Sequence, residues 1–112
     1  MPAKSRSRTT TRRRNGTPEW SIHPGEILRE EFLKPLAMSV YELARRLRVP
    51  APRINDIVRE RRGVTPDTAL RLARFFGTTP QFWLNLQASY ELKIAMQEAG
   101  TRIERDIAPL TA

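Results

Sequence analysis

The side chains best suited to a specific interaction lie in a short stretch, residues 49–60, whose pattern predicts a helix. At helical spacing, its apolar residues Ile54, Ile57 and Val58 face inward. The opposite face keeps small or planar polar side chains, which suit the floor of a DNA major groove. These outward residues are Ala51, Pro52, Arg53, Asn55, Asp56 and Arg59. Taken alone, the pattern fits an ordinary polar surface helix equally well, so its neighbours decide the interpretation.

Basic charge is concentrated around this stretch. The chain has a formal net charge of +8, of which residues 1–18 contribute +6. Residues 34–74 contribute another +6, and acidic flanks offset part of the total. A surface that binds a polyanion requires such a placement of charge. The distribution therefore favours a recognition helix for double-stranded DNA at residues 49–60.

Composition argues against other classes of protein. The 112 residues suffice for one small domain, and the absence of cysteine excludes disulfides and thiolate metal sites. No apolar run approaches the roughly 20 residues of a membrane span, so we expect a cytoplasmic, nucleoid-associated protein without membrane contact. The single histidine, His23, begins a predicted helix and is expected to cap or pack there. Without a phosphate loop or convergent carboxylates, we predict no enzyme, no catalytic residue, no cofactor and no metal.

Residues 1–20 are predicted to form a disordered, basic N-terminal arm. They are rich in Arg, Ser and Thr, and they offer almost no apolar surface to offset the entropic cost of ordering. Three roles remain open for the arm: general electrostatic attachment or solubility, contact with the minor groove, or ordering by a protein partner.

Start and stop signals predict the elements that position the recognition helix. A first helix begins near Pro24, is limited by Pro35, and has a predicted inner face of Ile27, Leu28, Phe32 and Leu36. A second begins at a capping box, in which Ser39 accepts from the Glu42 N–H and Glu42 reaches back to Ser39. Its predicted inner residues are Leu43, Ala44 and Leu47. A turn at residues 48–49 then completes a helix–turn–helix motif.

Two further helices complete the domain. One begins at Thr65 and ends at Gly77, with a predicted inner face of Ala69, Leu70, Leu72, Ala73 and Phe76. The last begins at about Pro80, where Thr79-Pro80-Gln81 repeats the same start signal, and ends at residue 99, with Gly100 as its stop signal. The sequence therefore predicts an all-α, five-helix domain over residues 21–100, which contains DNA-binding and dimerisation surfaces, and a C-terminal tail over residues 101–112.

The last predicted helix is apolar over more than one stripe. One stripe can close the core, whereas the other would be exposed on a monomer, so we predict a homodimer. The residues expected to form the dimer contact are Trp83, Leu86, Tyr90 and Ile94. The alternative is that one chain buries both stripes.

Several motifs carry a more specific resemblance. They are His-Pro-Gly-Glu-Ile-Leu at residues 23–28, the segment 39–58, Arg-Gly-Val-Thr-Pro-Asp-Thr-Ala-Leu-Arg-Leu-Ala at 62–73 and Phe-Gly-Thr-Thr-Pro-Gln-Phe-Trp-Leu-Asn-Leu-Gln at 76–87. Over about residues 21–98 the chain resembles the HigA antitoxin family, a branch of the Cro/C1-type, lambda-repressor-like helix–turn–helix proteins. The resemblance implies a five-helix fold, a homodimer on an inverted-repeat operator, repression of its own operon, and neutralisation of a HigB-type mRNA-cleaving toxin.

The family's DNA-contact positions map onto this chain residue by residue. They imply base readout by Ala51, Pro52, Arg53, Asn55 and Asp56, and phosphate contacts by Ser39, Arg59, Arg61 and Arg62. Arg53 is expected to donate two hydrogen bonds to a guanine. Asn55 either pairs with adenine or serves as a local cap or helix–helix hydrogen bond.

The sequence departs from the family pattern in its turns. Arg48 stands where relatives often have glycine, and Glu60 stands where Asn-Gly is common. A positive φ at Arg48 would cost on the order of 1 kcal/mol. The alternative function is a stand-alone repressor of the Cro/C1 type with no toxin partner.

Overall fold

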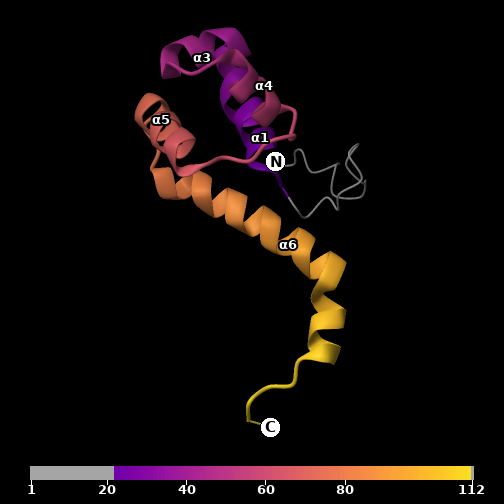
Figure 1. Ribbon diagram of the computed structural model, residues 1–112. Coiled ribbons are helices and arrows are strands. Elements are labelled where there is room, and N and C mark those ends of the chain that lie inside the picture. The colour runs from indigo at the N-terminus through magenta and orange to yellow at the C-terminus, as the bar shows by residue number, and fades with distance from the viewer. Residues whose placement is uncertain (1–21, 112) are drawn as a thin grey trace, which may run out of the picture. The chain divides into compact units, whose positions relative to one another are not determined.

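The computed structural model describes residues 22–111, in which helices are the only regular elements. Five helical segments follow one another, as predicted (Figure 1). The first is continuous through α1 (Pro24–Ile27), η2 (Leu28–Leu33) and α2 (Lys34–Leu36). The others are α3 (Val40–Leu47), α4 (Ala51–Val58), α5 (Pro66–Phe76) and α6 (Pro80–Asp106). The predicted arm at residues 1–20 lies outside the described residues.

A π-turn widens the first helical segment. In this turn the Lys34 N–H donates to the carbonyl of Arg29, five residues earlier. Pro35 explains why the π-turn lies at this point of the helix. Its ring has no N–H and would clash with a carbonyl of the preceding turn in a regular α-helix. The extra residue rotates the end of this segment, so Leu33 is buried and Leu36 is 55% exposed. The prediction that Leu36 faces the core was therefore wrong.

Polar side chains begin the helices where the sequence predicted them. The His23 Nδ1 accepts from the backbone N–H two residues later at 2.8 Å, which confirms its capping role. The Ser39 hydroxyl accepts from the N–H three residues later at 3.0 Å. Thr65 and Thr79 cap α5 and α6 in the same way, at 3.4 and 3.1 Å. Each cap satisfies a backbone donor that the helix itself leaves unpaired.

The core forms where the first helical segment packs against α4 and where α3 packs against α4 and α5 (Figure 1). Trp83 in the first turn of α6 is fully buried, and its indole N–H donates to the Thr78 hydroxyl at 2.8 Å. Its ring lies 5.2 Å from the Phe32 ring, centroid to centroid. The buried apolar residues are Leu28, Leu33, Leu43, Ala44, Leu47, Ile54, Ile57, Val58, Val64, Ala69, Leu72, Ala73 and Trp83.

Two predictions about α5 and α6 were wrong. Leu70 is 60% exposed, because Ala69, Leu72 and Ala73 define the buried side of α5 and Leu70 lies off that side. The helix α6 continues through Gly100 to Asp106. Gly100 stays within the helix, whereas Gly77 takes φ 78° in the left-handed region and ends α5. A glycine stops a helix only where the chain needs that left-handed conformation.

Arg48 ends α3 in the left-handed region, at φ 61° and ψ 47°. Arg48 thus has the positive φ for which a cost on the order of 1 kcal/mol is expected. Glu60, after the recognition helix, also has a positive φ of 63°. Both turns therefore keep their geometry at the expense of some backbone strain.

Replacing Arg48 by glycine is expected to raise the free energy of unfolding by about 1 kcal/mol, because glycine adopts the left-handed conformation without a Cβ clash. Arg45→Gly, within the same helix, is the control and should lower it by about 1 kcal/mol. Urea unfolding of both variants measures the difference. Equal destabilisation by the two changes would contradict the strain assigned to Arg48.

Candidate nucleic-acid interface

The helix α4 separates its two faces as predicted. Ile54, Ile57 and Val58 are buried, which confirms the predicted inward face. Pro50 and Pro52 occupy the N-cap and the first turn, where a missing backbone donor breaks no helical hydrogen bond. The remaining side chains of α4 are at least partly exposed.

Part of that outer face surrounds a shallow pocket. Its volume is about 350 Å³, and it lies between the start of α3 and the outer side of α4. The residues that line it are Val40, Tyr41, Ala51, Pro52, Asn55 and Arg59. Within residues 22–111, the Asn55 side chain forms no hydrogen bond, so the expected alternative of a local cap is not what the structure shows. Three predicted base-contact residues therefore lie together around one surface depression.

The Arg53 side chain is hydrogen-bonded to Asp67, a residue that the sequence analysis had assigned only to the start of a helix. Its Nη1 donates to the Asp67 Oδ2 at 2.8 Å, and the Arg71 Nε donates to the same oxygen at 2.9 Å. Hydrogen bonds from Arg71, and then from Arg53, hold the pKa of the Asp67 carboxyl below its usual value. The base-contact candidate Asp56 is also paired, with Arg61 at 3.6 Å.

The predicted phosphate-contact residues differ in how free they are. Among the described residues, the side chains of Arg59 and Arg62 form no ion pair, so their charge is available to an anion. The Arg61 guanidinium forms an ion pair with the Asp56 carboxylate. Ser39 already caps α3, and it lines the same 450 Å³ pocket as Ala51, so the starts of α3 and α4 lie close together.

Glu42 does not complete the capping box. Its carboxylate accepts instead from Arg45 at 2.7 Å and from Arg46 at 3.1 Å. The hydrogen bond from Arg45 is the main cause that lowers the pKa of Glu42. The acid near the helix N-terminus thus organises two arginines on the exposed side of α3.

Two long-range contacts hold the recognition helix in place. Arg29 donates to the carbonyl of Val58 and pairs with the Glu60 carboxylate at 3.4 Å, 31 residues away. After the helix, the Val64 N–H donates to the Gln87 side chain at 2.8 Å. No local spacing pattern signals contacts at such separations, and sequence reasoning therefore missed both.

The predicted dimer residues do not share one environment. Trp83 is enclosed by its own chain, so its assignment to a dimer contact was wrong: the first turn of α6 lies against the core. Leu86 is partly buried against that core. Tyr90 and Ile94 are partly exposed, and their role in a dimer stays a prediction. The large apolar side chains left exposed on the same helix include Leu92 and Met96, at 61% and 60%.

A capped helix, a tight turn and a second helix with a polar outer face define a helix–turn–helix protein, and the helix–turn–helix family model matches residues 30–83. Virulence-associated protein I of Dichelobacter nodosus is 60% identical over 78 residues, which are 70% of this chain and 72% of that protein. The solved Pseudomonas aeruginosa antitoxin HigA with the higBA promoter is 54% identical, with a TM-score of 0.79 over 80% of this chain and 98% of that one. A HigA-family addiction module antidote protein from Coxiella burnetii is 50% identical, with a TM-score of 0.76 over 80% and 97% of the two chains.

The chain therefore belongs to the HigA family of antitoxins, which confirms the resemblance seen in its motifs. This is a family of DNA-binding proteins and not of enzymes, as the sequence predicted. Within residues 22–111, no helix has both the length and the apolar character needed to cross a membrane.

Proposed function

We propose that this protein is the antitoxin of a type II toxin–antitoxin system. It binds operator DNA as a dimer, represses its own operon, and neutralises a HigB-type mRNA-cleaving toxin in the cytoplasm. The observation that carries DNA binding is α4, which buries Ile54 and Ile57 and leaves Pro52, Asn55 and Arg59 around an open depression. The Pseudomonas aeruginosa relative, solved with the higBA promoter, supports the operator as ligand.

In this proposal, α4 enters the major groove with its first turns toward the bases. Ala51 and Pro52 offer small apolar contacts, whereas Arg53 and Asn55 offer hydrogen-bond donors to base edges. Arg59 and Arg62, which have no ion pair among the described residues, contact the phosphates. The basic residues 1–18 add further attraction for the backbone.

The dimer is part of the proposal. Two recognition helices related by a two-fold axis would read half-sites about 34 Å apart on an inverted repeat. The proposed contacts with a second copy are Leu86, Tyr90 and Ile94, together with the exposed apolar side chains of Leu92 and Met96. Sedimentation equilibrium of wild type and of Ile94→Glu tests this. A monomeric wild type would contradict the dimer.

The first experiment compares the purified protein on its own promoter and on scrambled DNA of equal length, at several salt concentrations. We expect a preference for the promoter of about a thousandfold or more. Equal and steeply salt-dependent binding to both DNAs would instead describe a non-specific polycation. Co-expression with the product of the adjacent gene then tests toxin neutralisation. We expect that gene product to stop growth on its own and co-expression of this protein to restore growth. A gene product that is not toxic, or whose toxicity is not relieved, would leave this protein as a repressor without a toxin partner.

Arg53→Ala is expected to cost about 1–3 kcal/mol of operator binding and to remove the preference at one base pair in each half-site. The reason is the loss of a planar donor pair that a guanine edge accepts. Binding to a complete set of single-base-pair operator variants measures the effect. A uniform loss of affinity over all variants would assign Arg53 to the backbone instead.

A further inference from the structure

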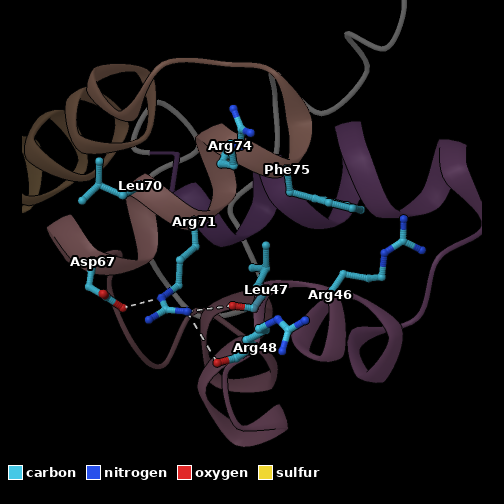
Figure 2. Close-up of a pocket in the computed structure, with 8 residues that line it drawn as sticks. All are labelled: Arg46, Leu47, Arg48, Asp67, Leu70, Arg71, Arg74 and Phe75. Carbon is cyan, nitrogen blue, oxygen red and sulfur yellow. Dashed lines mark hydrogen bonds and ion pairs between the residues drawn. The ribbon is translucent and has the colours of Figure 1, made fainter.

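A carboxylate at the start of α5 links the recognition helix to the turn of the motif. A single oxygen of Asp67 accepts from Arg53 at 2.8 Å and from Arg71 at 2.9 Å. Arg71 is itself fixed, because its Nη1 donates to the carbonyl of Leu47 at 2.9 Å and approaches that of Arg48 at 3.5 Å. Figure 2 shows Asp67 bonded to Arg71, and Arg71 bonded to the carbonyls of Leu47 and Arg48, at the side of a pocket of about 540 Å³ between the end of α3 and α5.

The arrangement does not act mainly on stability. The side chains of Arg53, Asp67 and Arg71 are all partly exposed, and ion pairs in such positions contribute little to folding. Its effect is geometric. An unrestrained arginine has many rotamers, whereas this one is held at one nitrogen by an acceptor whose own position is set by a second, anchored guanidinium.

The remaining side-chain donors of Arg53 are left for another partner. A guanidinium carries five N–H donors in one plane, and within residues 22–111 Asp67 is the only group bonded to the Arg53 side chain. A planar fork held at Nη1 by an anchored acceptor presents its Nε and Nη2 donors in a defined direction. Two hydrogen bonds to a guanine require this kind of orientation.

We propose that Asp67 is a positioning residue that sets the base specificity of Arg53, and this inference rests on the proposed operator binding. It acts in two ways. It orients the fork before DNA arrives, which reduces the ordering cost of the specific complex. It also places a negative charge beside Arg53, which disfavours loose association of that guanidinium with any phosphate.

The test compares Asp67→Asn with Glu42→Gln in the full-length protein. Glu42 is a matched control, because it is also an exposed carboxylate that bridges two arginines, and its removal changes the net charge equally. Affinities are measured for the operator, for each single-base-pair variant of one half-site, and for scrambled DNA. The base pair read by Arg53 is the one at which Arg53→Ala loses its preference, and thermal unfolding verifies that each variant is folded.

For Asp67→Asn we expect discrimination at that base pair to fall about fivefold or more, with the other positions unchanged. Affinity for scrambled DNA should stay equal or rise, because the variant is more basic. Glu42→Gln should keep discrimination at every position. Asp67→Glu, which retains a charged carboxylate, should recover part of the loss.

Several results would overturn the inference. Unchanged or stronger discrimination in Asp67→Asn would mean that the carboxylate is irrelevant or withholds Arg53 from the bases. An equal loss at all positions would show a structural role only. If Arg53→Ala changes the preference at no base pair, Arg53 contacts no base specifically, and Asp67 has no base-reading side chain to position. If wild type itself does not distinguish operator from scrambled DNA, the proposed function fails and the inference fails with it.

Discussion

Trp83→Ala is expected to lower the free energy of unfolding by about 3–5 kcal/mol, the largest effect of any single truncation in this core. The indole is fully buried, packs against Phe32, and satisfies its N–H on the Thr78 hydroxyl. Its removal leaves a cavity among groups that the first helical segment, α5 and α6 hold in place. Urea unfolding followed by circular dichroism measures the change.

Tyr41→Ala is the control for this prediction. Tyr41 is also a large aromatic residue, but it is 77% exposed, and its truncation should change stability by less than about 0.5 kcal/mol. A Trp83→Ala protein that keeps wild-type stability and loses only its self-association would restore Trp83 to the dimer contact, against its burial in the core.

Gly25→Ala should lower the free energy of unfolding by about 3 kcal/mol, although it adds only one methyl group. A Cβ at this position would overlap the carbonyl oxygen of Ile57 and lie 2.7 Å from its carbonyl carbon. The obstacle is backbone of the recognition helix and not a flexible side chain, so relief requires the first helical segment and α4 to separate. Operator affinity should fall with stability, because the same carbonyl accepts from the Glu60 N–H at the end of α4.

Gly100→Ala is the matched control, with the same methyl group added elsewhere. The nearest atom to its Cβ is 3.8 Å away, and alanine favours a helix interior over glycine by about 1 kcal/mol. We therefore expect Gly100→Ala to be neutral or stabilising. Similar destabilisation by both substitutions would show that glycine flexibility, and not the close approach to Ile57, is the cause.

Local signals in the sequence were sufficient for most of the fold. Capping side chains at Ser39, Thr65 and Thr79 marked the starts of three helices, and apolar spacing identified Ile54 and Ile57 as buried. These features succeed because each depends on residues within one or two turns. The left-handed Arg48 was predictable for the same reason, since the motif fixes the length of its turn.

The errors arose where backbone or tertiary context overrode local pattern. The π-turn before Pro35 shifts the register by one residue, so Leu33 replaces Leu36 on the buried face. Gly100 looked like a stop signal, but nothing after it turns the chain until the neighbourhood of Pro109. In such cases the helical periodicity of the sequence predicts a helix correctly, but it predicts the wrong buried residue or the wrong last residue of the helix.

The candidate site was predictable as a surface but not as a set of contacts. Spacing on α4 identified which residues face outward, and the structure gathers Ala51, Pro52 and Asn55 as expected. The partner of Arg53 could not be inferred, because Asp67 is 14 residues away and its local role at a helix start already explained its presence. In the role proposed for Asp67, specificity depends on such a second partner, and a partner of this kind carries no periodic signal.

The contacts of Arg29 with Val58 and Glu60, together with the close approach of Gly25 to Ile57, connect the first helical segment directly to the recognition helix. Under the proposed function, a toxin bound to the first segment would therefore move the recognition helix together with that segment. In the proposed dimer, such a toxin would act on repression through whole protomers, by blocking one from the duplex or by changing the spacing between the two. By either route, the proposed control of the operon would leave the surface of each recognition helix unchanged.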